Sequence, residues 1–263
     1  MTTDRHNAAP GPEVAIEVRH LTVSYGSQPA LLDVSVSLEK GLLIGVIGPN
    51  GSGKSTLIKA ILGFVRPDFG EVLIDGRPAS KLRGNVAYVP QRGAVDWHFP
   101  VTVEQVALMG RYSHVPWWRN LTKTDRQAAH AALETVQMMD MRHRQIGQLS
   151  GGQQQRVFIA RALAQDAEIL LLDEPFAGVD AATESAILEV LTLVKQRGRT
   201  LVVVHHDLAT AAEYFDRLLL LKQRLYGYGP PDAVLDPDLL TAVYGGELRV
   251  FADLARQQEA ASA

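Results

Sequence analysis

The 263-residue chain contains no cysteine. Disulfide bonds and thiolate metal sites are therefore excluded, and the absence fits a reducing compartment. No apolar run is long enough to span a bilayer, and the polar segment 1–12 lacks the apolar core of a signal peptide. We therefore expect a soluble intracellular protein.

An excess of charge of one sign is also missing. The formal net charge is −3, with 26 Lys and Arg against 29 Asp and Glu, so no strong attraction to nucleic acid or anionic lipid is expected. No internal repeat is present either. Hydrophobic residues make up 46% of the chain, enough for a sizeable core. The length fits one large domain or two small ones.

A glycine-rich loop lies between an apolar run at 42–47, which reads as a buried strand, and a helical pattern at 57–62. Strand, loop and helix in this order are the context that a phosphate-binding P-loop requires. The loop consists of Gly48, Pro49, Asn50, Gly51, Ser52, Gly53, Lys54, Ser55 and Thr56. Its glycines let backbone amides and the helix N-terminus face an anion. Lys54 adds a charge for the β- and γ-phosphates, and Ser55 is placed to ligate Mg²⁺.

Two carboxylates follow another apolar run, at 169–172. Asp173 and Glu174 stand at the end of this predicted strand, and ligands of an open parallel sheet bind at that edge. Asp173 is suited to hold Mg²⁺. Glu174 is predicted on the opposite side of the pleat, where it can act as general base on an attacking water.

A second anion-binding device is predicted at Ser150, Gly151, Gly152 and Gln153, which precede a convincing helix. Ser150 can cap that helix, and the two glycines leave the backbone amides bare. The plainer alternative is an ordinary Ser-Gly helix cap. If both devices bind phosphate, either they fold onto one nucleotide or each completes a site in a second copy of the chain.

The strand-like patterns fall into two groups. Those of the first third, at 14–19, 21–25, 31–38 and 70–76, predict a small antiparallel sheet around the P-loop strand. Those at 86–91, 169–172, 201–204 and 218–221 alternate with helical patterns and predict a parallel sheet. Between the first and second of these runs, 95–165 is expected to be mainly helical, with capping boxes beginning at Thr102 and Thr124.

Taken together, these motifs resemble the ATP-binding subunit of ABC transporters, over about residues 15–245. The resemblance rests on the P-loop, Gln91, the Leu-Ser-Gly-Gly-Gln signature at 149–153, residues 170–174, Asp180 and His206. It implies an α/β fold: a P-loop NTPase (RecA-like) core with an N-terminal antiparallel β subdomain and an inserted α-helical subdomain. The domain is expected over 14–250, between a disordered tail at 1–13 and a C-terminal tail at 251–263.

The same resemblance implies ATP hydrolysis with ATP and Mg²⁺ as cofactors. In the family, the signature of one subunit caps the ATP held by the P-loop of the other, which implies a homodimer and favours the second alternative above. It also implies integral membrane permease subunits, an indirectly associated substrate-binding protein, and a place at the cytoplasmic face of the cell membrane. Nucleic acid is not expected as a partner.

Several residue roles come from the resemblance alone. Tyr25 would stack on adenine, although a half-buried strand aromatic is the alternative. Gln91 would sense Mg²⁺ and water, Asp180 would communicate across the dimer, and His206 would contact the γ-phosphate. His205 and His206 also invite a metal-ligand interpretation, but adjacent residues on a strand point to opposite faces, so the two imidazoles cannot easily bind one ion.

The region after Gln91 is similar to the manganese, zinc or iron importer branch of the family. Its distinguishing piece is Trp97, His98, Phe99 and Pro100. An exposed Trp97 and Phe99 would suit the groove that receives a permease helix; alternatively, they pack the core of the helical insertion. His98 is expected at the surface.

We therefore expect an ATPase subunit that energises uptake of a divalent metal. One alternative is the ATPase subunit of a siderophore, haem or cobalamin importer. Another is a non-transport ABC ATPase of DNA repair or translation, which the lack of a coiled-coil insertion and of a basic stripe disfavours.

Overall fold

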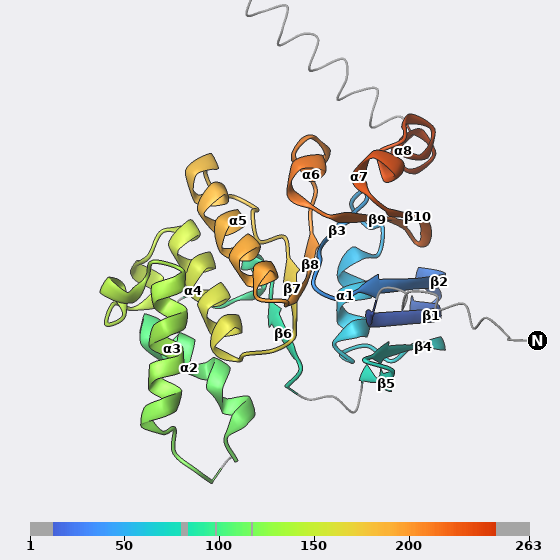
Figure 1. Cartoon of the computed structure of the whole chain (residues 1–263). Helices are drawn as coiled ribbons and strands as arrows, with labels where there is room; N and C mark the ends of the chain where they lie inside the picture. The colour runs from blue at the N-terminus through green and yellow to red at the C-terminus, as the bar shows by residue number, and fades with distance from the viewer. Residues whose placement is uncertain (1–12, 80–83, 98, 117, 246–263) are drawn as a thin grey trace, which may run out of the picture.

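The computed structural model describes residues 13–79, 84–97, 99–116 and 118–245. Two β-sheets and a mainly helical region lie side by side in this part of the chain (Figure 1). Residues 1–12 of the tail predicted at 1–13, the whole tail at 251–263 and His98 lie outside the described residues. None of the described helices combines the length and apolar character needed to cross a membrane.

The first sheet is antiparallel, as predicted, with the strand order β2-β1-β4-β5. Its strands are β1 (Val14–Tyr25), β2 (Gln28–Glu39), β4 (Phe69–Ile74) and β5 (Arg77–Pro78). The two runs expected at 14–19 and 21–25 form one strand. Between them, His20 adopts a left-handed φ of 48°, and the register with β2 shifts there. This bulge explains the break in the apolar alternation.

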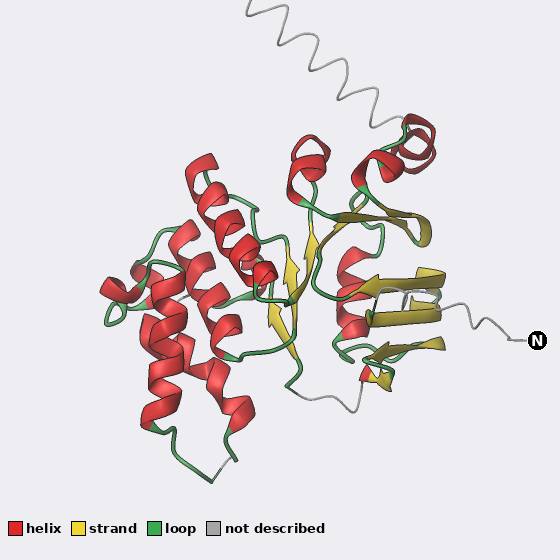
Figure 2. Ribbon diagram, in the orientation of Figure 1, coloured by secondary structure: helices red, strands yellow, loops and turns green. Residues whose placement is uncertain are grey.

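The second sheet contains the P-loop strand, which therefore does not belong to the antiparallel sheet. Figure 2 shows the strands in yellow and the helices in red. The strand order of the second sheet is β10-β9-β3-β8-β7-β6, with every pair parallel except β10 and β9. The strands are β3 (Leu43–Ile47), β6 (Val86–Val89), β7 (Ile169–Asp173), β8 (Thr200–Val204), β9 (Arg217–Lys222) and β10 (Arg224–Gly229). The parallel arrangement brings the carboxyl ends of β3, β7 and β8 to one edge.

Different helices cover the two faces of this sheet. On one face, α1 (Lys54–Ile61) packs Leu57 and Ile58 into a core with the inner side of the antiparallel sheet. On the other, α4 (Gly151–Ala164) and α5 (Ala181–Gln196) bury Val157, Ile159 and Leu191. Since β3, β7 and β8 are buried at every residue, their apolar runs serve both cores. The sheet therefore separates α1 from α4.

The helical region is made of α2 (Val103–Met109), α3 (Lys123–Thr135) and α4, which pack on one another. The capping box at Thr102 is confirmed. The predicted start of the second capping box is wrong by two residues, because the box begins at Thr122 and not at Thr124. Asp125 is its third helical residue and also accepts a hydrogen bond from Arg111 at 3.0 Å. Together the bonds from Thr122 and Arg111 lower the pKa of Asp125 to about 2.

Short elements complete the described chain. Three-residue 3₁₀ turns occupy η2 (Arg92–Ala94), η4 (Met139–Met141) and η5 (Ile146–Gln148), and a longer one is η3 (Gly110–His114). Three helices follow β8: α6 (Leu208–Tyr214), α7 (Pro231–Val234) and α8 (Pro237–Tyr244).

Candidate nucleotide site

The P-loop is held between the two sheets by close backbone contacts. Gly53 caps α1 with a left-handed φ of 99°, and a Cβ there would lie 2.5 Å from the carbonyl oxygen of Ala30 in β2. At Gly48 a Cβ would lie 2.1 Å from the carbonyl oxygen of Leu221 in β9. Neither position has room for a side chain, so glycine is required to seat the loop.

Lys54 folds back over the loop that precedes it. Its Nζ donates hydrogen bonds to the carbonyl oxygens of Gly48 at 2.8 Å and Pro49 at 3.0 Å. Burial lowers the pKa of Lys54, while the nearby Glu174 and Asp173 carboxylates raise it. Within the part of the chain that the structure describes, the buried hydroxyl of Ser52 has no hydrogen-bond partner. An ammonium beside an unpaired buried hydroxyl fits an incoming phosphate.

Ser55 and Asp173 meet across α1 and β7. The Ser55 hydroxyl donates to Asp173 Oδ1 at 3.4 Å. Burial raises the pKa of Asp173, partly opposed by the bond from Ser55. Two oxygen donors of this kind suit Mg²⁺. The described residues hold no group of three or more His, Cys, Asp or Glu placed for a metal, so an ion here would need water or phosphate oxygens as further ligands.

Glu174 is directed by a turn rather than by the strand. Strand β7 ends at Asp173, and Glu174 takes a left-handed φ of 51°, which is uncommon for a residue with a side chain. The alternation of the pleat therefore does not set its direction, contrary to the reason on which the prediction rested. Gln91, just after β6, donates from Nε2 to Glu174 Oε2 at 2.9 Å. The two residues thus meet although they are far apart in sequence.

His205 and His206 follow β8, which ends at Val204, so strand alternation does not set their directions, and their ring centroids lie 5.8 Å apart. His206 is exposed, whereas His205 is only 2% exposed. The His205 ring lies edge-on to Phe176 and Phe215, and its Nε2 hydrogen-bonds the hydroxyl of Thr210 at 2.9 Å. Burial, followed by the neighbouring His206, lowers the pKa of His205 to about 4. His205 is therefore a neutral packing residue, and no metal cluster includes it among the described residues.

The buried His205 predicts a pH dependence of stability. Between its ordinary pKa of 6.5 and about 4, the unfolded chain binds a proton at this position that the folded chain does not. The free energy of unfolding should therefore fall as the pH drops through this window, by at most about 1.4 kcal/mol per pH unit for one proton. Urea melts at several pH values should show a shallower fall for His205→Gln than for the wild-type chain or for the control His143→Gln, at an exposed position. Identical slopes of unfolding free energy against pH for the wild-type chain and His205→Gln would contradict this prediction.

The signature forms the N-terminus of α4. Ser150 accepts a hydrogen bond from the Gln153 amide, and Gln153 Oε1 accepts one from the Ser150 amide, so the predicted cap is a capping box. The next two amides, of Gly151 and Gly152, stand in the first turn, where the helix offers no acceptor. A Cβ at Gly152 would lie 2.4 Å from the methyl carbon of Thr183. The signature thus packs directly on the first turn of α5.

Asp180 and Tyr25 lie at two further element ends. Asp180 caps α5, accepting from the amide of Thr183 at 2.9 Å, so it stands next to the signature helix. Tyr25 ends β1 and is 51% exposed. Hydrogen bonds from Thr183 hold the Asp180 side chain in place. The role of Asp180 across a dimer and the stacking of Tyr25 on adenine stay predictions.

The predicted residues form two groups. One gathers at the carboxyl edge of the parallel sheet and consists of the P-loop (Gly48 to Thr56), Gln91, Asp173, Glu174 and, after β8, His206. The other lies at the helix ends that face one another on α4 and α5 and consists of Ser150, Gly151, Gly152, Gln153 and Asp180. Because α1 and α4 cover opposite faces of the sheet, the P-loop and the signature are held by different layers, and Gln91 and Arg92 lie between them.

The two tryptophan-region residues behave differently. Trp97 packs against the helical core, with its ring 5.0 Å from that of Phe158, while Phe99 is exposed.

Arg92 was not predicted from the sequence as a site residue. Its backbone oxygen accepts from Trp97 Nε1 at 2.9 Å, and its guanidinium reaches α4. A basic residue directly after Gln91 was the only signal for it.

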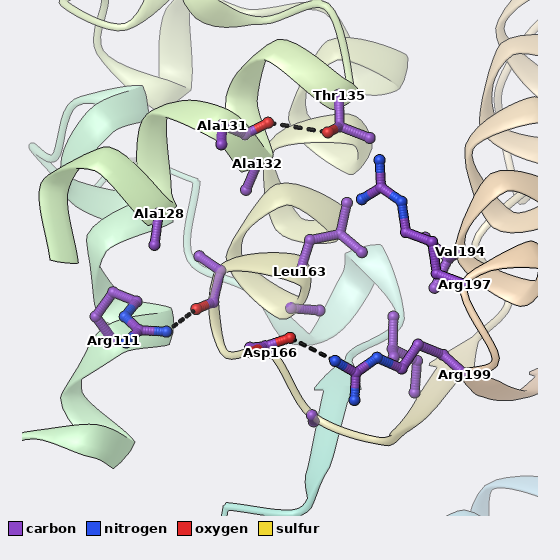
Figure 3. A pocket seen from close by; sticks show the side chains of 14 residues that line it. Arg111, Ala128, Ala131, Ala132, Thr135, Leu163, Asp166, Val194, Arg197 and Arg199 are labelled. Carbon is purple, nitrogen blue, oxygen red and sulfur yellow. Dashed lines mark hydrogen bonds and ion pairs between the residues drawn. The ribbon is translucent and has the colours of Figure 1, made fainter. Parts of the chain in front are cut away.

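A cavity of about 280 Å³ lies between α3, α4 and α5 (Figure 3). Its lining includes Arg111, which donates to the carbonyl of Ala164, and Arg199, which donates to Asp166. Asp166 and Arg199 precede β7 and β8, so this cavity is at the amino edge of the sheet. None of the predicted site residues lines it. The candidate site is therefore at the opposite edge.

Comparisons with known proteins show which family the chain is similar to. A family model described as ABC transporter matches residues 31–177. The chain is 51% identical to the manganese transport system ATP-binding protein MntB of Bacillus subtilis over 90% of its own length and 95% of that protein. It is 52% identical to the zinc transport system ATP-binding protein TroB of Treponema pallidum over 89% of this chain and 88% of that one.

Two solved structures are also similar. An inward-facing metal-chelate type ABC transporter superposes with a TM-score of 0.79 at 30% identity, covering 88% of this chain and 89% of that chain. The ADP conformation of an ATP-binding cassette superposes with a TM-score of 0.75 at 27% identity, covering 86% of this chain and 97% of that one.

Proposed function

The chain belongs to the ABC transporter family of ATP-binding proteins, which hydrolyse ATP, and from that premise we propose that it energises the import of a divalent metal ion. The observation that supports a divalent metal as the transported substrate is sequence identity. About half of the aligned residues are identical to those of a manganese and of a zinc transport ATP-binding protein, over nearly the whole chain. The solved transporter of metal-chelate type, at 30% identity, keeps siderophore, haem or cobalamin import as the second candidate.

The proposed chemistry uses the residues at the carboxyl edge of the sheet. Lys54 would stabilise charge on the β- and γ-phosphates, and the loop amides would cradle them. Ser55 and Asp173 would hold Mg²⁺, which when bound neutralises charge on the same phosphates. Glu174 would accept a proton from the attacking water, and Gln91 would hold the Glu174 carboxylate in place through the 2.9 Å bond. His206 would contact the γ-phosphate, and Tyr25 would stack on the adenine.

The separation of α1 and α4 supports a homodimer. The P-loop helix and the signature helix lie on opposite faces of one sheet, so we propose that the signature serves a nucleotide held by a second copy. The amides of Gly151 and Gly152 would then meet that nucleotide's phosphates, and Asp180 would lie at the contact between the copies. Two ATP molecules would be enclosed between the two chains.

The groove that we propose for the permease lies between the core and the helical region. A cavity of about 570 Å³ is lined by residues of both the core and the helical region, including Phe64, Tyr88 and Met109. Phe64 is 68% exposed, and its ring lies edge-on to that of Tyr88. An exposed apolar groove of this kind suits a short amphipathic helix. Neither Trp97 nor Phe99 lines it. We propose that a permease helix docks here, which would hold the chain at the cytoplasmic face of the membrane.

Transport by the intact complex tests this function. The complex, purified from its native membranes through a tag on this chain and placed in vesicles, should take up Mn²⁺ or Zn²⁺ when ATP is supplied, with ATP consumed at a matching rate. Ser150→Arg should abolish uptake and ATP turnover, because the larger, positively charged side chain blocks closure on the partner's nucleotide. The isolated variant chain should still bind ATP within about 2-fold of the wild-type affinity, a difference of under 0.5 kcal/mol.

Ser37→Arg, at an exposed position of β2, is the matched control and should transport normally. Uptake of a ferric siderophore in place of free metal would favour the second candidate. Normal ATP turnover by Ser150→Arg would contradict the role of the signature.

A further inference from the structure

Arg92 stands between the two groups of site residues. Its neighbour Gln91 holds Glu174 at the carboxyl edge of the sheet. Arg92 itself turns to the helical region, where Nη2 donates to Gln154 Oε1 at 3.3 Å. A Cβ on Gly151 would lie 2.7 Å from Nη1, so the guanidinium lies against the first turn of α4. Two adjacent side chains therefore reach the two different groups.

The charge of Arg92 is not matched by the protein around it. Among the described residues, no carboxylate forms an ion pair with Arg92, and its only side-chain bond is to a neutral amide. The N-terminus of α4 carries the positive end of the helix dipole, so a cation there is unfavourable. Ser150 adds no negative charge. The arrangement becomes favourable when an anion lies against both.

The backbone at Arg92 is held by packing, and its side chain is exposed. Its carbonyl accepts a bond from Trp97 Nε1, and the Trp97 ring rests on Phe158 of α4. The 3₁₀ turn that begins at Arg92 is thereby fixed to the helix that carries the signature. The guanidinium that extends from this fixed backbone presents several N–H donors in a plane, and this geometry matches phosphate oxygens.

We propose that Arg92 donates hydrogen bonds to the terminal phosphate of the ATP bound by the P-loop of a second copy, beside Ser150 and the amides of α4. The proposal rests on the proposed function, since it needs the two copies to close on ATP. Arginines that reach a transferring phosphoryl group from a partner accelerate the reaction by about 10³–10⁵ in other nucleotide hydrolases. Arg92 adds to the signature a cation that the helix itself cannot supply.

Heterodimers made from two differently tagged copies test whether Arg92 acts on the partner's nucleotide. Lys54→Ala in one copy leaves a single intact P-loop, in the other copy, which also carries Glu174→Gln so that ATP is retained. Arg92→Ala is then placed on either copy. On the Lys54→Ala copy, it removes the arginine that faces the intact P-loop. On the other copy, it removes only the arginine that faces the disabled one.

The measurement is the dissociation rate of ATP from the single intact site. We expect at least a 10-fold faster release, about 1.4 kcal/mol, when Arg92→Ala is on the Lys54→Ala copy, and an unchanged rate in the other arrangement. Arg92→Lys at the same position should give an intermediate rate, because charge remains but the fork is lost. Arg224→Ala, at an exposed position of β10, is the matched control. Equal effects in both arrangements, or an effect only on the copy with the intact P-loop, would overturn the proposal.

The same experiment separates this inference from the proposed function. If the heterodimer without any Arg92 substitution fails to retain ATP, closure of two copies on the nucleotide is itself contradicted. If it retains ATP and the two Arg92 arrangements behave alike, only the role of Arg92 is lost. ATP binding by the isolated Arg92→Ala chain should stay within about 2-fold of wild type, because Arg92 does not contact its own P-loop.

Discussion

Glu174→Gln is expected to slow ATP turnover by at least about 100-fold while ATP stays bound, since a positioned general base contributes about 10²–10⁴. The substitution preserves size and leaves an oxygen to accept the bond from Gln91, but the amide cannot take a proton from water. With hydrolysis blocked, a dimer enclosing ATP should accumulate. Phosphate release measures the first effect, and size-exclusion chromatography with and without ATP measures the second.

Glu189→Gln is the control for the loss of one negative charge, because Glu189 is exposed on α5. It should turn over ATP at the wild-type rate and form no trapped dimer. Brisk phosphate release by Glu174→Gln would remove this carboxylate from the role of base, and the left-handed backbone at Glu174 would then lack a catalytic purpose.

Lys54→Ala should weaken MgATP binding by about 10- to 100-fold and abolish turnover. Hydrogen bonds to charged groups are worth about 1.5–3 kcal/mol each, and no other cation bonds the loop carbonyls of Gly48 and Pro49 among the described residues. Titration with a fluorescent ATP analogue measures the affinity. Lys54→Met keeps the apolar stem in its buried position and should show the same loss.

Lys59→Ala, on the same helix but exposed, removes an equal charge and should leave the affinity within about 2-fold of wild type. Thermal melts of all three variants show whether the fold survives. Wild-type affinity in both Lys54 variants would mean that the loop amides alone bind the phosphates.

The parts of the site that follow local rules could be predicted from the sequence. The P-loop needs only a strand, a tight glycine turn and a helix in series, and all three are visible in residues 42–62. Asp173 could be placed because parallel strands share one carboxyl edge. The helix cap at Ser150 could be placed because a serine stands directly before the helical pattern, and the structure adds the reciprocal bond to Gln153 three residues on.

Other features depend on contacts that no local pattern contains. The start of α3 is set at Thr122 rather than Thr124, since Asp125 completes the box and is held by Arg111 from the preceding turn. Glu174 leaves the strand through a left-handed turn and meets Gln91 from another strand. The continuous apolar runs of β3, β7 and β8 indicate burial on both faces, but they do not say which helix covers which face. The position of Arg92 against α4 depends on which face of the sheet α4 covers, so it could not be predicted either.

The placement of α1 and α4 on opposite faces of the sheet has a consequence for the kinetics of the proposed dimer. In that dimer, the P-loop and the signature of one copy serve different nucleotides, so each encounter of two copies would create two complete sites at once. The specific activity of the isolated chain would therefore rise with its concentration and collapse on dilution. A membrane partner that keeps two copies at close range would replace this second-order step, and it could regulate ATP consumption by spacing alone.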